Sequence, residues 1–131
     1  MHHETIGGQL TLGNGSKLPL SKAARAGDFV FLSGQLALGD DGQLIGDDVT
    51  TQTARCIENI RSILGQAGCD LSDMIKATVW LIDRHDFAGF NKVYAQYFRD
   101  NPPARSVVCS DLMLPGALVE IEVVAYRPTS P

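Results

Sequence analysis

Hydrophobic residues recur along the chain at two spacings, one typical of β-strands and the other typical of α-helices. The first clear strand covers residues 29–38, where successive side chains are expected to point to opposite faces of a sheet. By this alternation one face carries Val30, Leu32 and Gly34, and the other carries Phe31 and Gln35. Residues 1–17 contain a Gly-Asn-Gly turn signal and predict an N-terminal hairpin or a loose segment.

An amphipathic helix is predicted to follow. Asp47, Asp48 and the two threonines after them are suited to cap its first turn, because their side-chain oxygens accept hydrogen bonds from unpaired backbone amides. Gly68 is placed to end the helix in a left-handed conformation. The stripe expected to face the core recurs at helical spacing and consists of Thr53, Ile57, Ile60, Leu64 and Ala67.

A second helix is predicted to begin at residues 85–86. The Asn101-Pro102-Pro103 segment ends it, because proline lacks the amide hydrogen that a helix interior needs. Between the two helices, residues 74–82 form a predicted strand with little polar alternation, which is typical of burial on both faces. The stripe of the second helix consists of Phe87, Phe90, Tyr94 and Tyr97, with Phe98 adjacent.

Two further predicted strands, 105–109 and 117–126, complete a sheet that two helices can cover on one face only. The predicted fold class is therefore α+β, with a mixed β-sheet and both helices on the same face. The other face needs cover because its strands are apolar, and a symmetric oligomer provides that cover. A chain of 131 residues has room for one domain, spanning residues 1–131.

Charge and composition argue against several function classes. The formal net charge is −4 and the basic residues are scattered singly, so nucleic acid is not an expected partner. The three cysteines and three histidines never fall at metal-ligand spacing, so no metal site is expected, and the cysteines are expected to be small buried thiols. Without a cationic leader or a long apolar stretch, the protein is expected to be cytoplasmic and to have no membrane partner.

Candidate chemistry is concentrated in the C-terminal third of the chain. Arg105 follows a rigid Pro-Pro step, and a guanidinium held there can bind a carboxylate through two parallel hydrogen bonds. From spacing alone, a surface residue with a weak ion pair is the simpler interpretation. Glu120 and Glu122 share one face of a strand; both fit solvated carboxylates as well as a buried group with a raised pKa that handles protons.

Several motifs, taken together, resemble the Rid family, also called the YjgF/YER057c/UK114 family. Pro102-Pro-Ala-Arg105-Ser106 and Gly116-Ala-Leu-Val-Glu120-Ile-Glu122 resemble its paired C-terminal signature. Phe31-Leu-Ser-Gly-Gln35 is similar to its first core strand, and residues 52–59 and 87–94 are similar to its two helices. The resemblance covers about residues 18–127, with the motifs in the family's order and spacing.

The resemblance implies a chorismate-mutase-like fold that assembles as a homotrimer around an inner β-barrel. It implies active sites in the clefts between subunits and hydrolysis of reactive 2-enamino or 2-imino acids to 2-keto acids and ammonia. No cofactor is needed for that reaction. Position by position, it implies that Arg105 binds the substrate carboxylate and that Glu120 orients or deprotonates the attacking water. Phe87, Asn91 and Ser33 correspond to residues that line the family's pocket.

One departure concerns the pocket itself. The family usually carries Gly-Pro-Tyr-Ser near the N-terminus, whereas this chain has Leu18-Pro-Leu20-Ser21, so Leu20 replaces the tyrosine that faces the pocket. The change puts the identity of the substrate in doubt more than the class of reaction. Two alternatives to the deaminase therefore remain: a non-catalytic trimer that binds or senses carboxylates such as 2-keto acids, and, as a weaker candidate, an endoribonuclease or translation inhibitor.

Overall fold

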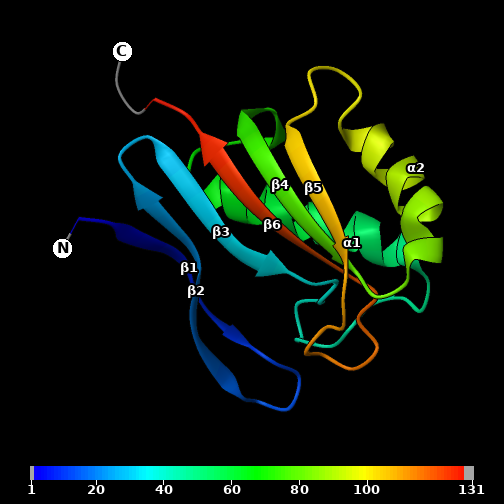
Figure 1. Cartoon of the computed structure of the whole chain (residues 1–131). Helices are drawn as coiled ribbons and strands as arrows, with labels where there is room; N and C mark the ends of the chain where they lie inside the picture. The colour runs from blue at the N-terminus through cyan, green and yellow to red at the C-terminus, as the bar shows by residue number, and fades with distance from the viewer. Residues whose placement is uncertain (1, 129–131) are drawn as a thin grey trace.

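A single β-sheet of six strands organises the computed structural model, which describes residues 2–128 (Figure 1). The strands lie in the order β1-β2-β3-β6-β4-β5. Neighbouring strands are antiparallel except β4 and β5, which are parallel because a helix returns the chain between them. Their bounds are β1 (Glu4–Thr11), β2 (Lys17–Ala26), β3 (Phe29–Gln35), β4 (Met74–Leu81), β5 (Ala104–Cys109) and β6 (Val119–Tyr126).

The long helix α1 (Val49–Gln66) begins and ends where the sequence predicts. Asp48 caps it by accepting a hydrogen bond of 2.7 Å from the backbone amide of Thr51. After the helix, Gly68 adopts a left-handed φ of +76°, which a residue with a side chain rarely adopts. The predicted core stripe of α1 is buried at every position, from Thr53 to Ala67.

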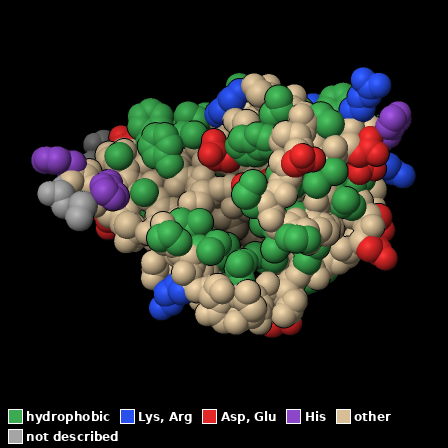
Figure 2. All heavy atoms as spheres, turned by 60° about the horizontal axis from the view of Figure 1, so that its bottom comes forward, with side chains coloured by type: hydrophobic (Ala, Val, Ile, Leu, Met, Phe, Trp, Pro, Cys, Tyr) green, Lys and Arg blue, Asp and Glu red, His purple; other side chains and the backbone are tan. Residues whose placement is uncertain are grey.

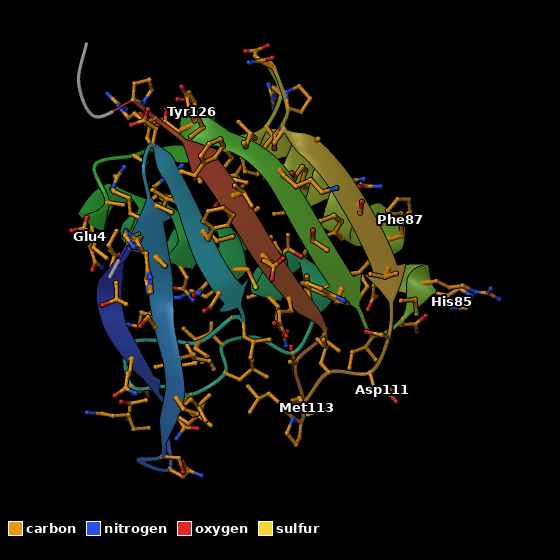
Figure 3. All side chains as sticks on the ribbon, turned by 60° about the vertical axis from the view of Figure 1, so that its left-hand side comes forward. Glu4, His85, Phe87, Asp111, Met113 and Tyr126 are labelled. Carbon is orange, nitrogen blue, oxygen red and sulfur yellow. The ribbon has the colours of Figure 1, made fainter. Side chains whose placement is uncertain are left out.

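The second helix, α2 (Phe87–Tyr97), follows a short 3₁₀ turn, Arg84–Asp86. It ends four residues before the Asn101-Pro-Pro segment that was expected to stop it. Phe90 and Tyr94 are buried as predicted, but Phe87 is 43% exposed and does not belong to the core stripe. Phe87 opens the helix beside the edge strand β5, so no further strand covers it (Figure 3).

The predicted N-terminal hairpin is formed by β1 and β2. Its turn is closed by a hydrogen bond of 2.9 Å from the amide of Gly15 to the carbonyl oxygen of Leu12. Gly15 has a φ of +87°, which explains the glycine at this position. The hairpin adds two strands to the edge of the sheet, and the expectation of one domain over residues 1–131 stays a prediction.

Strand β3 is shorter than predicted and carries a β-bulge. Its pairing with β6 shifts register between Leu32 and Gln35, so that β3 has one residue more than its partner in this interval. Because of the extra residue, the simple alternation that placed Gly34 on the core face is wrong. A Cβ atom at Gly34 would point at the side chain of Glu120, which belongs to the opposite face.

The two faces of the sheet differ in what covers them. Both helices pack on one face, against residues such as Val79 and Ile121, which are fully buried (Figure 1). The opposite face, which we call the open face, exposes Phe31 (47%) and Tyr126 (41%). Residues 74–82 were expected to be buried on both sides, but on the open face of β4 the side chains are only half-buried in one chain.

One buried amide side chain ties two loops together at the end of the molecule that Figure 2 shows, where hydrophobic side chains gather around a hollow. Gln52 of α1 donates hydrogen bonds of 3.0 Å to the carbonyl oxygens of Gly46 and Gly116. Its carbonyl oxygen accepts a bond of 2.8 Å from the amide of Leu118. Gln52 thus uses both of its N–H donors and its carbonyl oxygen on backbone groups of the loops before α1 and before β6.

Of the three cysteines, Cys56 and Cys69 are buried thiols, as the sequence predicts. Cys109 is exposed instead, which corrects that expectation for the third cysteine. It is the last residue of β5, an edge strand, so the sheet covers it on one side only. Burial raises the pKa of the Cys56 thiol far above its usual range, so Cys56 stays protonated and inert.

Candidate functional site

Arg105 lies near the start of β5 with its guanidinium packed against aromatic rings of α2. The guanidinium carbon lies 4.9 Å from the ring centre of Tyr94, 5.4 Å from that of Phe90 and 5.8 Å from that of Phe87. The negative faces of the rings attract the cation and restrict its motion. Among residues 2–128 Arg105 forms no ion pair, so its hydrogen-bond donors are available for an external anion.

A hollow of about 400 Å³ adjoins the guanidinium. Asn91 of α2 lines it together with Arg105, so the structure brings together these two residues that the sequence singles out. Phe87 joins them through its ring contact with Arg105. We call Arg105, Phe87 and Asn91 the Arg105 half-site.

Tyr94 also lines the hollow, and its hydroxyl group has an unusual environment. It is buried and has no hydrogen-bond partner among the described residues. Burial raises the pKa of this tyrosine, and the positive charge of Arg105 opposes that rise. The tyrosine therefore stays neutral, and its ring serves as a surface on which the guanidinium rests.

Glu120 lies on the open face, in the middle of the sheet. It is half-buried, and burial raises the pKa of its carboxyl group, with a smaller contribution from the negative charge of Glu122. Its carboxylate occupies the space above Gly34, where a Cβ atom would lie only 1.9 Å from Oε2. The bulge of β3 therefore makes room for a carboxyl group that is a stronger base than an ordinary glutamate.

Ser33 and Leu20 accompany Glu120 on the side of the sheet away from β5. The hydroxyl of Ser33 donates a hydrogen bond of 2.7 Å to the carbonyl oxygen of Ser21, so it links β3 to β2. Leu20 lies in β2 and is half-buried. We call Glu120, Gly34 and Ser33 the Glu120 half-site. Leu20 lies four strand positions from β5, or roughly 19 Å, so it does not reach Arg105 in one chain.

Arg105 and Glu120 do not meet within one chain. Arg105 pairs with Ala77, whose side chain is buried under the helices, whereas Glu120 pairs with Trp80 on the open face. Strand β4 also separates β5 from β6, a spacing of roughly 10 Å. The two residues are thus on opposite faces of the sheet, and a chain on its own presents two separate half-sites.

Sequence reasoning missed the supporting residues. Helical spacing predicts Phe90 and Tyr94 as core residues, and it does not show that their rings also support the guanidinium of Arg105. Strand alternation predicts the wrong face for Gly34, because the bulge in β3 shifts the register between Leu32 and Gln35. The one signal for it is a glycine inside a strand otherwise rich in large residues.

Comparison with known proteins gives the family. The family model described as Endoribonuclease L-PSP matches residues 15–127, most of the chain. This chain belongs to the Rid family. The family resemblance predicted from the motifs around Arg105 and Glu120 is therefore confirmed.

Relatives of this Rid protein carry two kinds of name. A RutC family protein of Pyrococcus horikoshii is 43% identical over 110 residues, covering 83% of this chain and 87% of the relative. The 2-iminobutanoate/2-iminopropanoate deaminase of Homo sapiens is 36% identical over 110 residues, covering 83% and 80%. The crystal structure of RidA from an Antarctic Psychrobacter species matches with a TM-score of 0.84 and 31% identity, covering 95% of this chain and 99% of that one. The mixed α+β fold predicted from the sequence is thus the fold of this family.

Other kinds of site find no support in the described part of this Rid protein. No group of His, Cys, Asp and Glu residues within 2–128 is arranged to hold a metal ion. His85 lies on the surface, in the short turn before α2, and contacts Asp83 at 2.9 Å. No helix among these residues is long and apolar enough to cross a membrane.

Proposed function

We propose that this protein is a hydrolytic deaminase of 2-enamino and 2-imino acids, giving 2-keto acids and ammonia. The observation that carries the proposal is the Arg105 half-site, in which a guanidinium is held on aromatic rings beside an open hollow and lacks an ion-pair partner among the described residues. A carboxylate that carries its reactive carbon next to it is the kind of substrate that such a fork positions. The deaminase names of mammalian relatives support the same class of substrate.

The proposal includes a homotrimer with sites between subunits. Arg105 of one subunit and Glu120 of the next would form one site, because the two residues lie on opposite faces within one chain. The exposed aromatic residues of the open face support the assembly, since Phe29, Phe31 and Tyr126 form a ring cluster with little cover in one chain. Burial of these open faces against one another would form the inner barrel.

The chemistry follows from the charges of the two half-sites. Arg105 binds the carboxylate and holds the iminium carbon beside Glu120, whose carboxylate takes a proton from the attacking water. The oxygen adds to the carbon, which gives a neutral amino group on a tetrahedral carbon. Glu120 then returns its proton to the nitrogen. As the C–N bond breaks, the Glu120 carboxylate takes up the proton of the hydroxyl group on the same carbon, so that the 2-keto acid and ammonia leave, and Glu120 finally passes this proton to the departing ammonia as ammonium. A glutamate with a raised pKa suits both proton transfers, because it is a better base than an ordinary carboxylate.

The remaining residues would shape the pocket. Phe87 provides an exposed aromatic wall next to Arg105, and Asn91 provides a polar contact in the hollow. Ser33 and Leu20 would face them from the neighbouring subunit, with Leu20 making that wall more apolar than a tyrosine would. The proposal involves neither nucleic acid nor a membrane, and it assigns the reaction to the cytoplasm.

The first test is a deamination assay. Imino acids are generated in situ by an amino-acid oxidase, and release of keto acid is compared for the wild type and Arg105→Ala. We expect the wild type to accelerate release and the variant to lose about two to three orders of magnitude in kcat/KM, because a buried carboxylate contact is lost. Equal rates for the two proteins across small and bulky imino acids would refute the proposal.

A second candidate function is binding of carboxylates without turnover. The observation in its favour is that the Arg105 half-site is complete in one chain and needs no contribution from Glu120. Such a protein would bind 2-keto acids saturably and release no ammonia. The same assay, run beside a binding titration with 2-oxobutanoate, distinguishes the two functions.

A further inference from the structure

A polar cavity of about 290 Å³ lies on the helix side of the sheet, away from Arg105. The β1–β2 hairpin, the end of β3 and α1 enclose it, and its size is at the lower end of the range for small-molecule sites. Neither half-site uses it, except that Gly34 lies between this cavity and Glu120. The side chains that give it its character are Gln9, Lys22, Gln35, Arg55, Asn59 and Gln66.

Three of the amide side chains around this cavity donate N–H groups to backbone carbonyl oxygens of the protein itself. Asn59 donates both of its hydrogens, at 3.0 and 2.9 Å, to the carbonyl oxygens of Leu36 and Leu38. Gln35 donates to the carbonyl oxygen of Ser33 at 2.9 Å, and Gln9 donates across the hairpin to that of Leu18 at 3.3 Å. Asn59 has no N–H left, so its amide oxygen can only accept, whereas Gln9 and Gln35 each keep one N–H beside an accepting oxygen. Acceptors therefore outnumber donors among these three amides, which favours a ligand that carries N–H or O–H donors.

Two cations complete the lining. Lys22 is half-buried and has no ion-pair partner within residues 2–128. The first part of its side chain packs against Gly7 of β1, where an added Cβ atom would lie 3.1 Å from the Cβ atom of Lys22. Arg55 donates from Nε to the carbonyl oxygen of Leu38 at 3.1 Å and contacts the carboxylate of Asp40 at 3.4 Å. Because Asp40 offsets one of the two positive charges, the cavity carries a net charge of +1 and favours one anionic group.

We propose that this cavity binds a free α-amino acid as a zwitterion. Its carboxylate would face Lys22 and the remaining donors of Arg55, and its ammonium group would donate to the amide oxygens of Asn59 and its neighbours. A simple anion would leave those acceptors unsatisfied, and a simple cation would be repelled by Lys22. The combination of a lysine with several amide oxygens therefore selects a ligand that carries both charges.

The same cavity has a physical route to the Glu120 half-site. Gly34 lines the cavity with its backbone, and the position of its missing side chain is filled by the carboxylate of Glu120. A ligand that binds to Gln35 and displaces the bulge of β3 would also displace Gly34, whose backbone contacts the carboxylate of Glu120. Amino-acid binding would then change the proton affinity of Glu120. This regulatory part rests on the proposed function, whereas binding itself does not.

The test is an NMR titration of the full-length protein with glycine, acetate and methylammonium as probes. It uses the Arg105→Ala variant, so that carboxylate binding at Arg105 does not contribute. We expect saturable shifts at Gln9, Gln35, Asn59 and Gln66, with glycine binding at least about tenfold more tightly than either half-probe. Absence of saturable shifts at these residues, or equal affinity for acetate and glycine, overturns the proposal.

Matched variants show whether the lysine is responsible. Lys22→Met should weaken glycine binding by about tenfold, Lys22→Arg should retain it, and Lys92→Met should leave it unchanged, since Lys92 is exposed on α2. If Lys22→Met and Lys92→Met bind glycine with the same affinity, the proposed role of Lys22 in this cavity is wrong. The link to Glu120 is read from the carbon chemical shift of its carboxyl group as pH is varied. An identical titration with and without glycine overturns the link, whatever the outcome of the deamination assay.

Discussion

The two half-sites are built from opposite physical principles. The guanidinium of Arg105 is held in place by contact with three aromatic rings of α2, and no carboxylate among the described residues forms an ion pair with it. Glu120 is a carboxyl group whose ionised form is destabilised, since burial and the negative charge of the neighbouring Glu122 both raise its pKa. One half-site therefore offers a positive group that is ready for an anion, and the other offers a base that gains by taking up a proton.

This difference suggests why a chain on its own would be a poor catalyst. A cation on one face and a base on the other cannot act on a single small molecule, however well each is positioned. Assembly of identical chains can bring complementary surfaces together without any new element, because every copy presents both half-sites.

The largest effect is expected from mixing two inactive variants. Arg105→Ala and Glu120→Gln should each lose most activity, because each removes one half of every site. When the two are unfolded together and refolded, the proposed trimer would contain both variants and roughly a quarter of its sites would regain both residues, so about a quarter of the wild-type rate should return. The rate of keto-acid release measures this, with each variant refolded alone as the control. A mixture as inactive as its parts would show that the sites are not shared between subunits.

A smaller loss is expected when Gly34 is replaced by alanine. The new Cβ atom would lie 1.9 Å from Oε2 of Glu120, so the carboxylate must move by about an ångström and activity should fall by up to about a hundredfold. Gly65→Ala is the matched control, because nothing lies within 4 Å of the added atom and alanine favours a helix. Wild-type kcat/KM in Gly34→Ala would contradict the placement of Glu120.

Glu122→Gln should change the pH dependence of the reaction more than its maximal rate. The negative charge of Glu122 raises the pKa of Glu120, so its removal should lower that pKa. Since Glu120 must be ionised to act as a base, activity rises as pH rises through its pKa, and the acidic limb of the profile should move to lower pH. A limb that stays in place or moves to higher pH would show that Glu120 does not control it.

The smallest effect concerns stability in the Arg105 half-site. Tyr94→Phe removes a buried hydroxyl that has no partner among the described residues, so the free energy of unfolding should rise by about 1 kcal/mol or stay unchanged. Tyr97→Phe is the control, because its hydroxyl donates to Glu58 at 2.8 Å and its loss should destabilise the protein. Thermal unfolding measures both changes. A clear loss of stability in Tyr94→Phe would reveal a partner for the hydroxyl in the assembled protein.

Local signals in the sequence predicted much of the fold. The cap at Asp48, the core stripe of α1 and the left-handed Gly68 depend on residues close in sequence, so their pattern was sufficient. The exposure of Phe87 was not predictable in this way. Its spacing fits the stripe of α2, but its environment depends on β5 being the last strand of the sheet.

The candidate site required information that no local pattern contains. Arg105 and Glu120 were identified from the motifs, but their faces depend on the register of β4 with both β5 and β6. The position of Gly34 depends on one extra residue in β3, which reverses the alternation along the strand. Each of these is set by long-range pairing, which a sequence pattern does not specify.

The anchor at Gln52 has a consequence for how such a protein can diverge. Its three hydrogen bonds involve only backbone groups of Gly46, Gly116 and Leu118, so they place no demand on the other side chains of these loops. The loop before β6 exposes Met113 almost completely, at 97%, and substitution there leaves the anchor intact (Figure 3). Substitutions can therefore change the exposed surface of this loop while its backbone path stays fixed by Gln52.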